Sequence, residues 1–418
     1  MALKPEHVQG SRRIIPAGWR VRELGDIGEC LIGLTYKPVN VKPSGILVLR
    51  SSNVSEGSLR FLDNVYVDVA VPDRIIVRRG DILICVRNGS RDLIGKCALI
   101  DDGTAGMTFG AFMCVFRTPY HDFVFQQFQS GSIKKQIEEH LGATINQITN
   151  KSLKSFQILM PDHEDEQRAV AAALSDTDTL LSSLDRLLAK KRDIKQAVMQ
   201  QLLTGKQRLP GFIEEWEVKR LGDFGKCLRG VSYSGDTDLS SHDTNTTNRL
   251  LRSNNVQAAT INTKDVQFVN RERVSEQQIM QVNDVLICMA NGSKGLVGKA
   301  GIFKINDGYV YTFGAFMGCY RTQPQLADPA FIFFLFQTNQ YRDCINNLLA
   351  GSSINNLKPS AVESLEFDVP QRPEQTAIAA VLSDMDAEID MLHQRRDKTH
   401  AIKQGMMQEL LTGKTRLV

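Results

Sequence analysis

The chain repeats its own sequence after roughly 200 residues, and this repeat restricts the fold more than any other feature. The segment WRVRELGDIGEC at residues 19–30 returns as WEVKRLGDFGKC at residues 216–227. The hexapeptide TFGAFM, which begins at Thr108, returns unchanged at Thr312. Six identical residues in a row rarely arise by chance. The 418 residues therefore predict two equivalent lobes, each long enough to bury a core of its own.

Each lobe is followed by a segment that predicts a long helix, over residues 162–204 and 373–412. The endings of these segments, at 194–209 and 402–417, differ at only four of sixteen positions. Between 378 and 392, apolar residues recur at steps of 4, 3, 4 and 3, which is a heptad seam that needs a partner helix. We expect the two helices to form an antiparallel coiled coil with a lobe near each end, in a pseudo-two-fold symmetric arrangement.

Short strand-like runs separated by Gly, Asn, Ser and Pro fill the lobes, and one helix interrupts them, around residues 123–141 and again around 329–349. The alternating strand and helix series of a doubly wound sheet is missing, so the predicted fold class is α+β with duplicated α/β domains. The apolar run FIFFLF at 331–336 is expected in the core. The predicted boundaries are 1–158 for the first lobe, 159–210 for the central helical region, 211–369 for the second lobe and 370–418 for the final helical region.

The charge of the chain is nearly balanced, at +3 overall. Residues 1–158 hold 20 Lys and Arg against 15 Asp and Glu, whereas residues 211–369 hold 15 against 17. Nucleic-acid-binding domains usually carry a clear basic excess. If the chain binds DNA, its partners must therefore neutralise some of the phosphates.

Cysteine spacing and apolar runs restrict the class of protein further. The eight cysteines form no CxxC pair, and no His lies at zinc-finger spacing, so we interpret them as buried small hydrophobic residues and predict no metal site. The FIFFLF run is too short to cross a bilayer, and the N-terminus has no apolar stretch of signal-peptide length. We expect a cytoplasmic protein with no membrane partner.

The order lobe, helix, lobe, helix, with both helices ending in MQxLLTGK at 199–206 and 407–414, resembles the specificity subunits of type I restriction-modification systems over essentially the whole chain. The resemblance implies two target-recognition domains, each of which reads one half of a bipartite site in double-stranded DNA. It implies that the helical spacer regions fix the gap and dock two modification (methyltransferase) subunits. Restriction subunits complete such complexes, and S-adenosylmethionine, ATP and Mg are expected on partner subunits, with no cofactor in this chain.

The two lobes are more alike than readers of different half-sites need to be. Both contain Asn-Gly-Ser, at residues 88 and 291, and both contain TFGAFM. We therefore hypothesise that the half-sites share some bases in inverted orientation. A target with wholly unrelated halves would contradict this hypothesis.

Reading a base edge needs donors and acceptors on loops, with Arg suited to guanine and Asn or Gln to adenine. Residues shared by the lobes are expected to build the frame or contact phosphates, and residues that differ are expected to choose bases. The shared candidates are Arg50, Asn53, Asn88, Ser90, Arg91 and Lys96 in the first lobe and Arg252, Asn255, Asn291, Ser293, Lys294 and Lys299 in the second. The alternative for the turns at 50–53 and 252–255 is that Asn and Ser hydrogen bonds simply hold them.

Two divergent loops, at 35–44 and 232–248, are the best candidates for base choice. Their expected DNA contacts are Tyr36, Lys37 and Tyr233. A second pair of candidates consists of Asn146 and Gln147 in the first lobe and Asn355 and Asn356 in the second. The alternative for each is an ordinary solvated loop.

Catalytic motifs are missing from the sequence. It contains neither the Gly-rich cofactor turn and Asn-Pro-Pro-aromatic loop of amino-methyltransferases nor a P-loop, and its seven His residues form no evident triad. We therefore predict a non-catalytic DNA-binding subunit. The alternative is a coiled-coil scaffold whose duplicated lobes bind proteins and have no DNA specificity, which the small net charge favours.

Overall fold

The computed structural model describes residues 15–141, 146–350 and 355–417. The chain folds as two compact units. Unit 1 comprises Met1–Asp185 with Gln394–Val418, and unit 2 comprises Arg186–His393. The boundaries predicted from the sequence treat the two helical regions as separate segments, whereas the compact units divide both long helices near their middle. Each unit therefore combines one lobe with half of each helix.

Unit 1 contains two four-stranded sheets. The central sheet has the order β2 (Glu29–Ile32), β11 (Met113–Arg117), β8 (Ile82–Cys85) and β9 (Cys97–Leu99). The outer sheet has the order β10 (Thr108–Phe109), β4 (Ile46–Leu49), β7 (Tyr66–Val67) and β3 (Val41–Lys42). Two short ribbons add β1 (Trp19–Glu23) with β12 (Gln157–Pro161) and β5 (Val54–Ser55) with β6 (Ser58–Leu59). The helices of this lobe are α1 (Leu24–Ile27), α2 (His121–Gln129), α3 (Gly131–His140) and α4 (Asn150–Lys154).

Unit 2 repeats this plan. Its central sheet has the order β14 (Gly225–Arg229), β23 (Met317–Thr322), β20 (Val285–Cys288), β21 (Ala300–Ile302), β18 (Thr260–Ile261) and β17 (Val256–Gln257). The outer sheet has the order β15 (Leu239–Ser240), β19 (Gln267–Asn270), β16 (Thr247–Leu251) and β22 (Tyr311–Phe313), and a ribbon pairs β13 (Glu217–Arg220) with β24 (Glu366–Val369). The helices are α6 (Pro329–Leu335), α7 (Asn339–Ala350) and α8 (Pro359–Glu363). The prediction of duplicated α+β lobes is confirmed.

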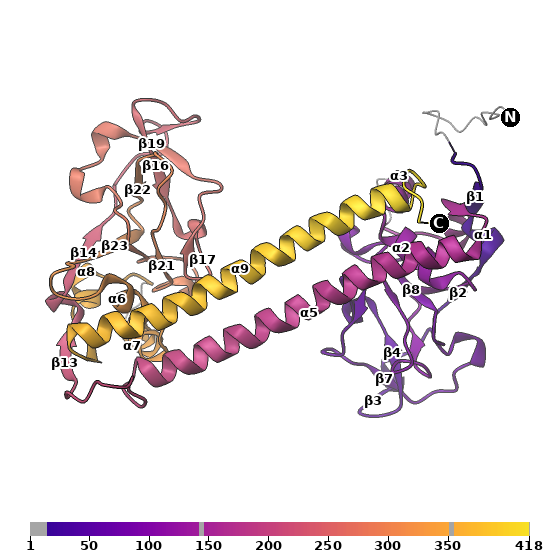
Figure 1. Cartoon of the computed structure of the whole chain (residues 1–418), viewed down its shortest axis with the longest axis horizontal. Helices are drawn as coiled ribbons and strands as arrows, with labels where there is room; N and C mark the ends of the chain where they lie inside the picture. Colours follow the sequence, from indigo (N-terminus) through magenta and orange to yellow (C-terminus); the bar gives the residue numbers. More distant parts are fainter. Residues whose placement is uncertain (1–14, 142–145, 351–354, 418) are drawn as a thin grey trace. The chain divides into compact units, whose positions relative to one another are not determined.

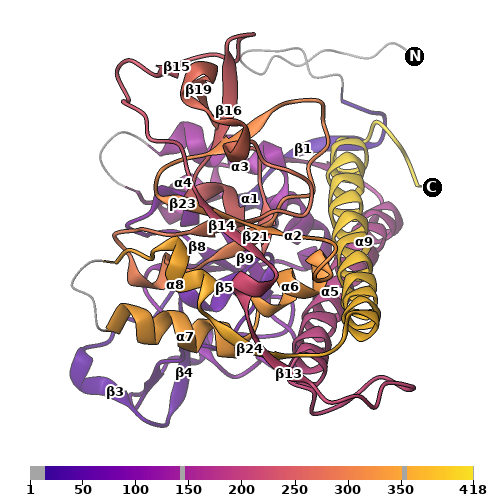
Figure 2. The same cartoon turned by 90° about the vertical axis from the view of Figure 1, so that its left-hand side faces the viewer.

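Both lobes have the same layers. In unit 2 the outer sheet lies beyond the central sheet, on the side away from α6 and α7 (Figure 1, Figure 2). The outer sheet of unit 1 lies likewise on the side away from α3 (Figure 1, Figure 2). All six residues of the FIFFLF run are at most 5% exposed, which confirms that they belong to the core.

The helix predicted within each lobe is broken into two, so that detail of the prediction is wrong. In unit 1 the break falls at Ser130, whose side chain accepts a hydrogen bond from the backbone N–H of Ile133 at 3.4 Å and begins α3. Serine at this position satisfies a backbone donor that a helix start would otherwise leave unpaired. In unit 2 the break falls between α6 and α7.

The two long helices are α5 (Glu164–Leu202) and α9 (Arg372–Leu410), each of 39 residues. In unit 1, ion pairs join Asp178 to Lys403 and Asp185 to Arg396, each at 2.6 Å. From Asp178 to Asp185 the residue numbers on α5 rise, whereas those of their partners on α9 fall from 403 to 396. The two segments are therefore antiparallel. The same holds in unit 2, where Lys191 contacts Glu388 at 2.6 Å and Lys195 contacts Asp386. Within each unit, the predicted antiparallel helix pair is confirmed (Figure 1).

A hydrogen-bonded cluster of one Trp, one Glu and one Arg joins each lobe to both helices. In unit 1, Glu166 at the start of α5 accepts hydrogen bonds from Trp19 Nε1 at 3.3 Å and from Arg416, just beyond α9. The equivalent residues of unit 2, which are Glu374, Trp216 and Arg208, make the same contacts. The repeated lobe-entry and helix-ending motifs therefore meet in space, which is a structural reason for their similarity.

All eight cysteines are free thiols, six of them buried. Burial raises the pKa of Cys97 and of Cys227 to about 12, whereas a hydrogen bond with Cys114 lowers the pKa of the half-buried Cys30 thiol.

Since the thiolate is the reactive form, iodoacetamide at pH 8 should label native Cys30 and spare Cys97 and Cys227. Peptide mass spectrometry reads this out, with urea-unfolded protein as the control in which all eight react. Equal labelling of Cys97 and Cys30 in the native protein would contradict the assignment.

Within the described residues, no helix combines the length and the apolar character needed to cross a membrane.

Candidate nucleic-acid interface

Three loops that are far apart in the sequence meet on one surface of unit 1. The Asn88 side chain donates a hydrogen bond to Ser51 Oγ at 3.1 Å, and the Asn146 side chain donates to the Gly89 carbonyl at 3.0 Å. An isolated β-bridge pairs Arg87 with Gln147. The turn after β4, the Asn-Gly-Ser loop after β8 and the segment before α4 therefore form one polar surface.

Unit 2 builds the same surface from its own loops. Asn291 donates to Ser253 Oγ at 3.5 Å, and Asn355 donates to the Gly292 carbonyl at 3.3 Å. The isolated bridge here joins Ala290 to Asn356. Candidates that the sequence offered as separate pairs are thus brought together twice, in matching geometry.

The turns after β4 and β16 are held by fully buried asparagines. Asn53 Oδ1 accepts a hydrogen bond from the Arg50 backbone at 2.9 Å, and its Nδ2 donates to the Arg60 carbonyl at 3.0 Å. Asn255 makes the equivalent bond to the Arg252 backbone at 2.8 Å. Both side chains are 0% exposed. Their geometry matches the alternative interpretation of these turns, so we remove Asn53 and Asn255 from the candidate DNA contacts.

Several candidate cations are held by the protein itself. Arg50 pairs with Asp63 at 2.6 Å, and Arg252 pairs with Asp265 at 3.4 Å. Arg91 donates to the carbonyls of Glu138 and Leu141, both at 3.2 Å, at the end of α3. A cation at this end of a helix satisfies free carbonyls. The remaining shared candidates of these loops are also exposed or half-buried. They are Ser90, Lys96, Ser293, Lys294 and Lys299.

The divergent loops begin beside the same surface. Isolated bridges join Leu34 to Gly110 and Val231 to Gly314, so each loop leaves the fold next to a TFGAFM turn. Tyr233 is half-buried and donates to Gln267 Oε1 at 3.3 Å. In unit 1, Lys37 is exposed and Tyr36 half-buried.

The structure adds three residues that the sequence analysis did not single out. The second phenylalanine of each TFGAFM turn points to the surface, where Phe112 is 58% and Phe316 is 72% exposed. In unit 1 the guanidinium carbon of Arg87 lies 5.0 Å from the centre of the Phe112 ring. The sequence pattern that could have indicated Phe112 and Phe316 is an apolar residue that both repeats keep next to a glycine turn.

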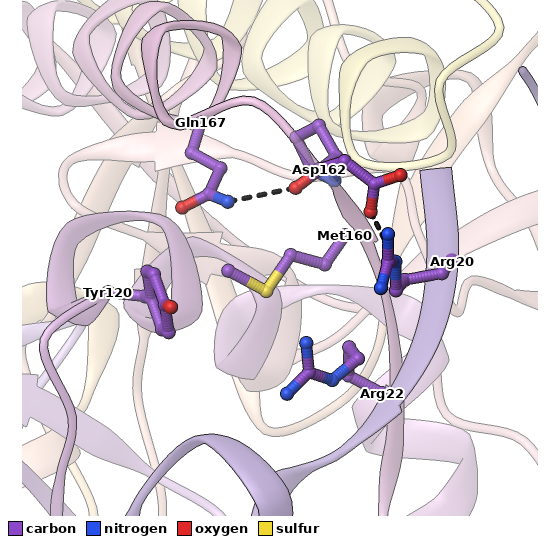
Figure 3. A pocket seen from close by; sticks show the side chains of 7 residues that line it. Arg20, Arg22, Tyr120, Met160, Asp162 and Gln167 are labelled. Atoms are coloured by element: carbon purple, nitrogen blue, oxygen red, sulfur yellow. Dashed lines mark hydrogen bonds and ion pairs between the residues drawn. The ribbon is translucent and has the colours of Figure 1, made fainter. Parts of the chain in front are cut away.

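A small pocket lies elsewhere in unit 1, beside the ribbon of β1 and β12 and the start of α5 (Figure 3). Arg20 and Asp162 form an ion pair across its rim, and the hydrogen bond from Arg20 lowers the pKa of the Asp162 carboxyl. Gln167 donates to the Pro161 carbonyl at 2.8 Å (Figure 3). These groups bind one another and join the lobe to the helix, so we assign the pocket a structural role.

The chain thus consists of two duplicated α+β units, each with a helix pair and a polar loop surface. Comparison with known proteins identifies the family that has this organisation. The chain belongs to the family described as the type I restriction modification DNA specificity domain, whose model matches residues 16–191 and 213–399. The EcoKI specificity subunit of Escherichia coli (strain K12) is 30% identical over 200 residues, covering 48% of this chain and 42% of that protein. The StySPI specificity subunit of Salmonella potsdam is 29% identical over 198 residues, again covering 42% of that protein. The chain thus matches less than half the length of these two relatives.

Other relatives match along nearly the whole chain. The putative MjaX specificity subunit of Methanocaldococcus jannaschii is 26% identical over 431 residues, covering 96% of this chain and 95% of that protein. The crystal structure of a type I restriction-modification S subunit from M. genitalium matches with a TM-score of 0.61 at 14% identity, covering 98% of this chain and 99% of that one. At this identity the structural match concerns the fold alone.

Proposed function

We propose that this chain is the DNA sequence-specificity subunit of a type I restriction-modification complex, in which each unit reads one half of a bipartite site. The observation that carries the proposal is the polar surface that three loops build in the same way in each unit, with Asn88 bound to Ser51 and Asn291 bound to Ser253. Base reading requires donors and acceptors held by a rigid frame. Membership of the specificity-domain family supports the same assignment.

The cations that are free to contact phosphates determine how much this chain contributes to DNA affinity. Lys96 in unit 1 and Lys294 in unit 2 are exposed beside the loop surfaces and are available for phosphates. Arg50 and Arg252 are already paired with carboxylates. Since the whole chain carries only +3, we assign the remaining phosphate contacts to partner subunits.

The helix endings supply the proposed docking sites for two modification subunits. Ile194 on α5 is 40% exposed in unit 2, and Ile402, at the same position of the repeat, is 50% exposed in unit 1. Packing against the lobes accounts for the buried identical positions of these endings, such as Leu202 and Leu410. Five identical residues are exposed in both copies, however, namely Ile194, Gln196, Gln200, Thr204 and Lys206 with their counterparts in α9 and the turn after it. Exposed positions have no packing reason to match, and a shared partner explains them.

The catalytic chemistry belongs to the partners in this proposal. We assign S-adenosylmethionine to the modification subunits and ATP and Mg²⁺ to the restriction subunits, because this sequence contains neither a Gly-rich cofactor turn nor a P-loop. This chain then contributes recognition and assembly and no catalysis.

Replacing Ile194 by Glu should remove one modification subunit from the purified complex, and Ile194→Glu with Ile402→Glu should remove both. A carboxylate cannot be buried in an apolar interface without a large desolvation cost. Light scattering coupled to size exclusion measures the stoichiometry. Ile213→Glu is the matched control, because Ile213 is 90% exposed and lies outside both long helices. An unchanged complex with the double variant would refute this docking face.

Selection from a random DNA library tests the main proposal against the protein-binding scaffold. The purified assembly of this chain with its modification subunits should enrich a motif of two short specified halves separated by a fixed unspecified gap. Modification subunits alone provide the control and should enrich no such motif. A library that stays random with the full assembly would favour the scaffold.

A further inference from the structure

One position on the loop surface differs sharply between the two units although its surroundings match. The Arg87 backbone N–H donates to the Phe112 carbonyl at 3.1 Å, and the Ala290 N–H donates to the Phe316 carbonyl at the same distance. The following Asn-Gly-Ser loops are closed alike, by hydrogen bonds from Ser90 N to Asn88 Oδ1 at 3.0 Å and from the equivalent Ser293 at 2.9 Å. Arg87 and Ala290 therefore occupy equivalent places on one frame.

The Arg87 side chain is exposed and oriented. Its guanidinium group lies over the Phe112 ring at 5.0 Å, and Phe112 itself is 58% exposed. Among the described residues, no carboxylate forms an ion pair with Arg87, in contrast to Arg50 and its partner Asp63. A cation–π contact restricts the plane of the guanidinium group without using its hydrogen-bond donors. Arg87 thus presents a free, oriented donor fork beside Asn88 and Gln147.

We propose that Arg87 is a specificity-determining residue of unit 1 that binds guanine through N7 and O6 in the major groove, and that Phe112 is its positioning residue. Bidentate Arg–guanine pairing needs a planar fork held at a fixed angle, which the stacked geometry provides. In unit 2, Ala290 and the 72% exposed Phe316 offer only apolar contact. Their equivalent ligand is the methyl group of thymine. The proposal rests on the proposed function and adds that the half-sites differ at this base.

Binding to duplexes that differ from the selected site by one base pair tests this inference, with the full chain and its modification subunits. The native assembly should prefer G at one position of the unit 1 half-site by roughly 5- to 150-fold, the range for a good bidentate contact. Arg87→Ala should reduce that preference to within about twofold and leave the other positions unchanged. Phe112→Leu should reduce the same preference while the salt dependence stays that of the native protein, because the charge remains.

Ala290→Arg provides the reciprocal test, since it should create a preference for G at the equivalent position of the unit 2 half-site. Arg87 is exposed and Ala290 is half-buried, and a native melting temperature for each variant excludes unfolding as the cause. Uniform weakening on all duplexes by Arg87→Ala, with a salt slope reduced by about one, would indicate a phosphate contact and overturn the proposal. So would a base preference that neither Arg87→Ala nor Ala290→Arg alters. If the native assembly selects no bipartite motif at all, the proposed function itself fails.

Discussion

Replacing Phe331 by Ala should lower the free energy of unfolding of unit 2 by about 3–5 kcal/mol. Phe331 is 0% exposed on α6 and packs in the same core as Ile332 and Tyr341. Truncation removes the apolar area of the ring and leaves a cavity that the surrounding side chains fill only in part. Urea unfolding, followed by tryptophan fluorescence and far-ultraviolet circular dichroism, measures the loss.

Phe316→Ala is the matched control for this prediction. It is the same substitution in the same unit, but Phe316 is 72% exposed, so stability should change by no more than about 0.5 kcal/mol. A loss of less than about 1 kcal/mol for Phe331→Ala would contradict the core assignment.

Asp81→Ala should destabilise unit 1 by about 3 kcal/mol, at the low end of the range for breaking a buried ion pair, because the Arg117 side chain remains 21% exposed. Asp81 is 2% exposed and binds Arg117 through two hydrogen bonds of 2.7 Å. It also accepts a hydrogen bond from the Arg78 backbone at 2.8 Å. Removing the carboxylate leaves the Arg117 guanidinium without this partner.

The position of this ion pair links stability to recognition. It joins the start of β8, which leads to Asn88, to the end of β11, which follows Phe112. We therefore expect Asp81→Ala to weaken reading of the unit 1 half-site as well. Asp102→Ala, at an exposed position of the same unit outside the candidate loops, is the control and should leave both unfolding and recognition unchanged. A native unfolding curve for Asp81→Ala would contradict the prediction.

Repeats and periodicity made most of the fold predictable. The heptad seam between 378 and 392 needed a partner, and the structure pairs the segments of α5 and α9 within each unit. The break at Ser130 was not predicted, because apolar spacing continues across it while a single serine hydrogen bond begins the next helix. Local capping therefore overrides periodicity at this point.

The candidate site was predictable only in part. Asn88 and Asn146 were chosen as polar residues at matched positions, but contact between their loops depends on tertiary pairing over long sequence separations. Asn53 illustrates the opposite limit, since nothing in its sequence context distinguishes a buried turn-holding amide from an exposed one. Arg87 was overlooked because comparison of the repeats draws attention to shared residues, whereas its partner position holds Ala290.

Methylome sequencing tests the central claim, that this chain sets the sequence specificity of a type I complex, most directly. Cells that carry the chain with its modification subunit are compared with cells that lack only this chain. We predict a bipartite, adenine-methylated motif with an unspecified gap that disappears on deletion and returns when the chain is supplied from a plasmid. An unchanged set of methylated motifs after deletion would contradict the claim and favour the protein-binding scaffold.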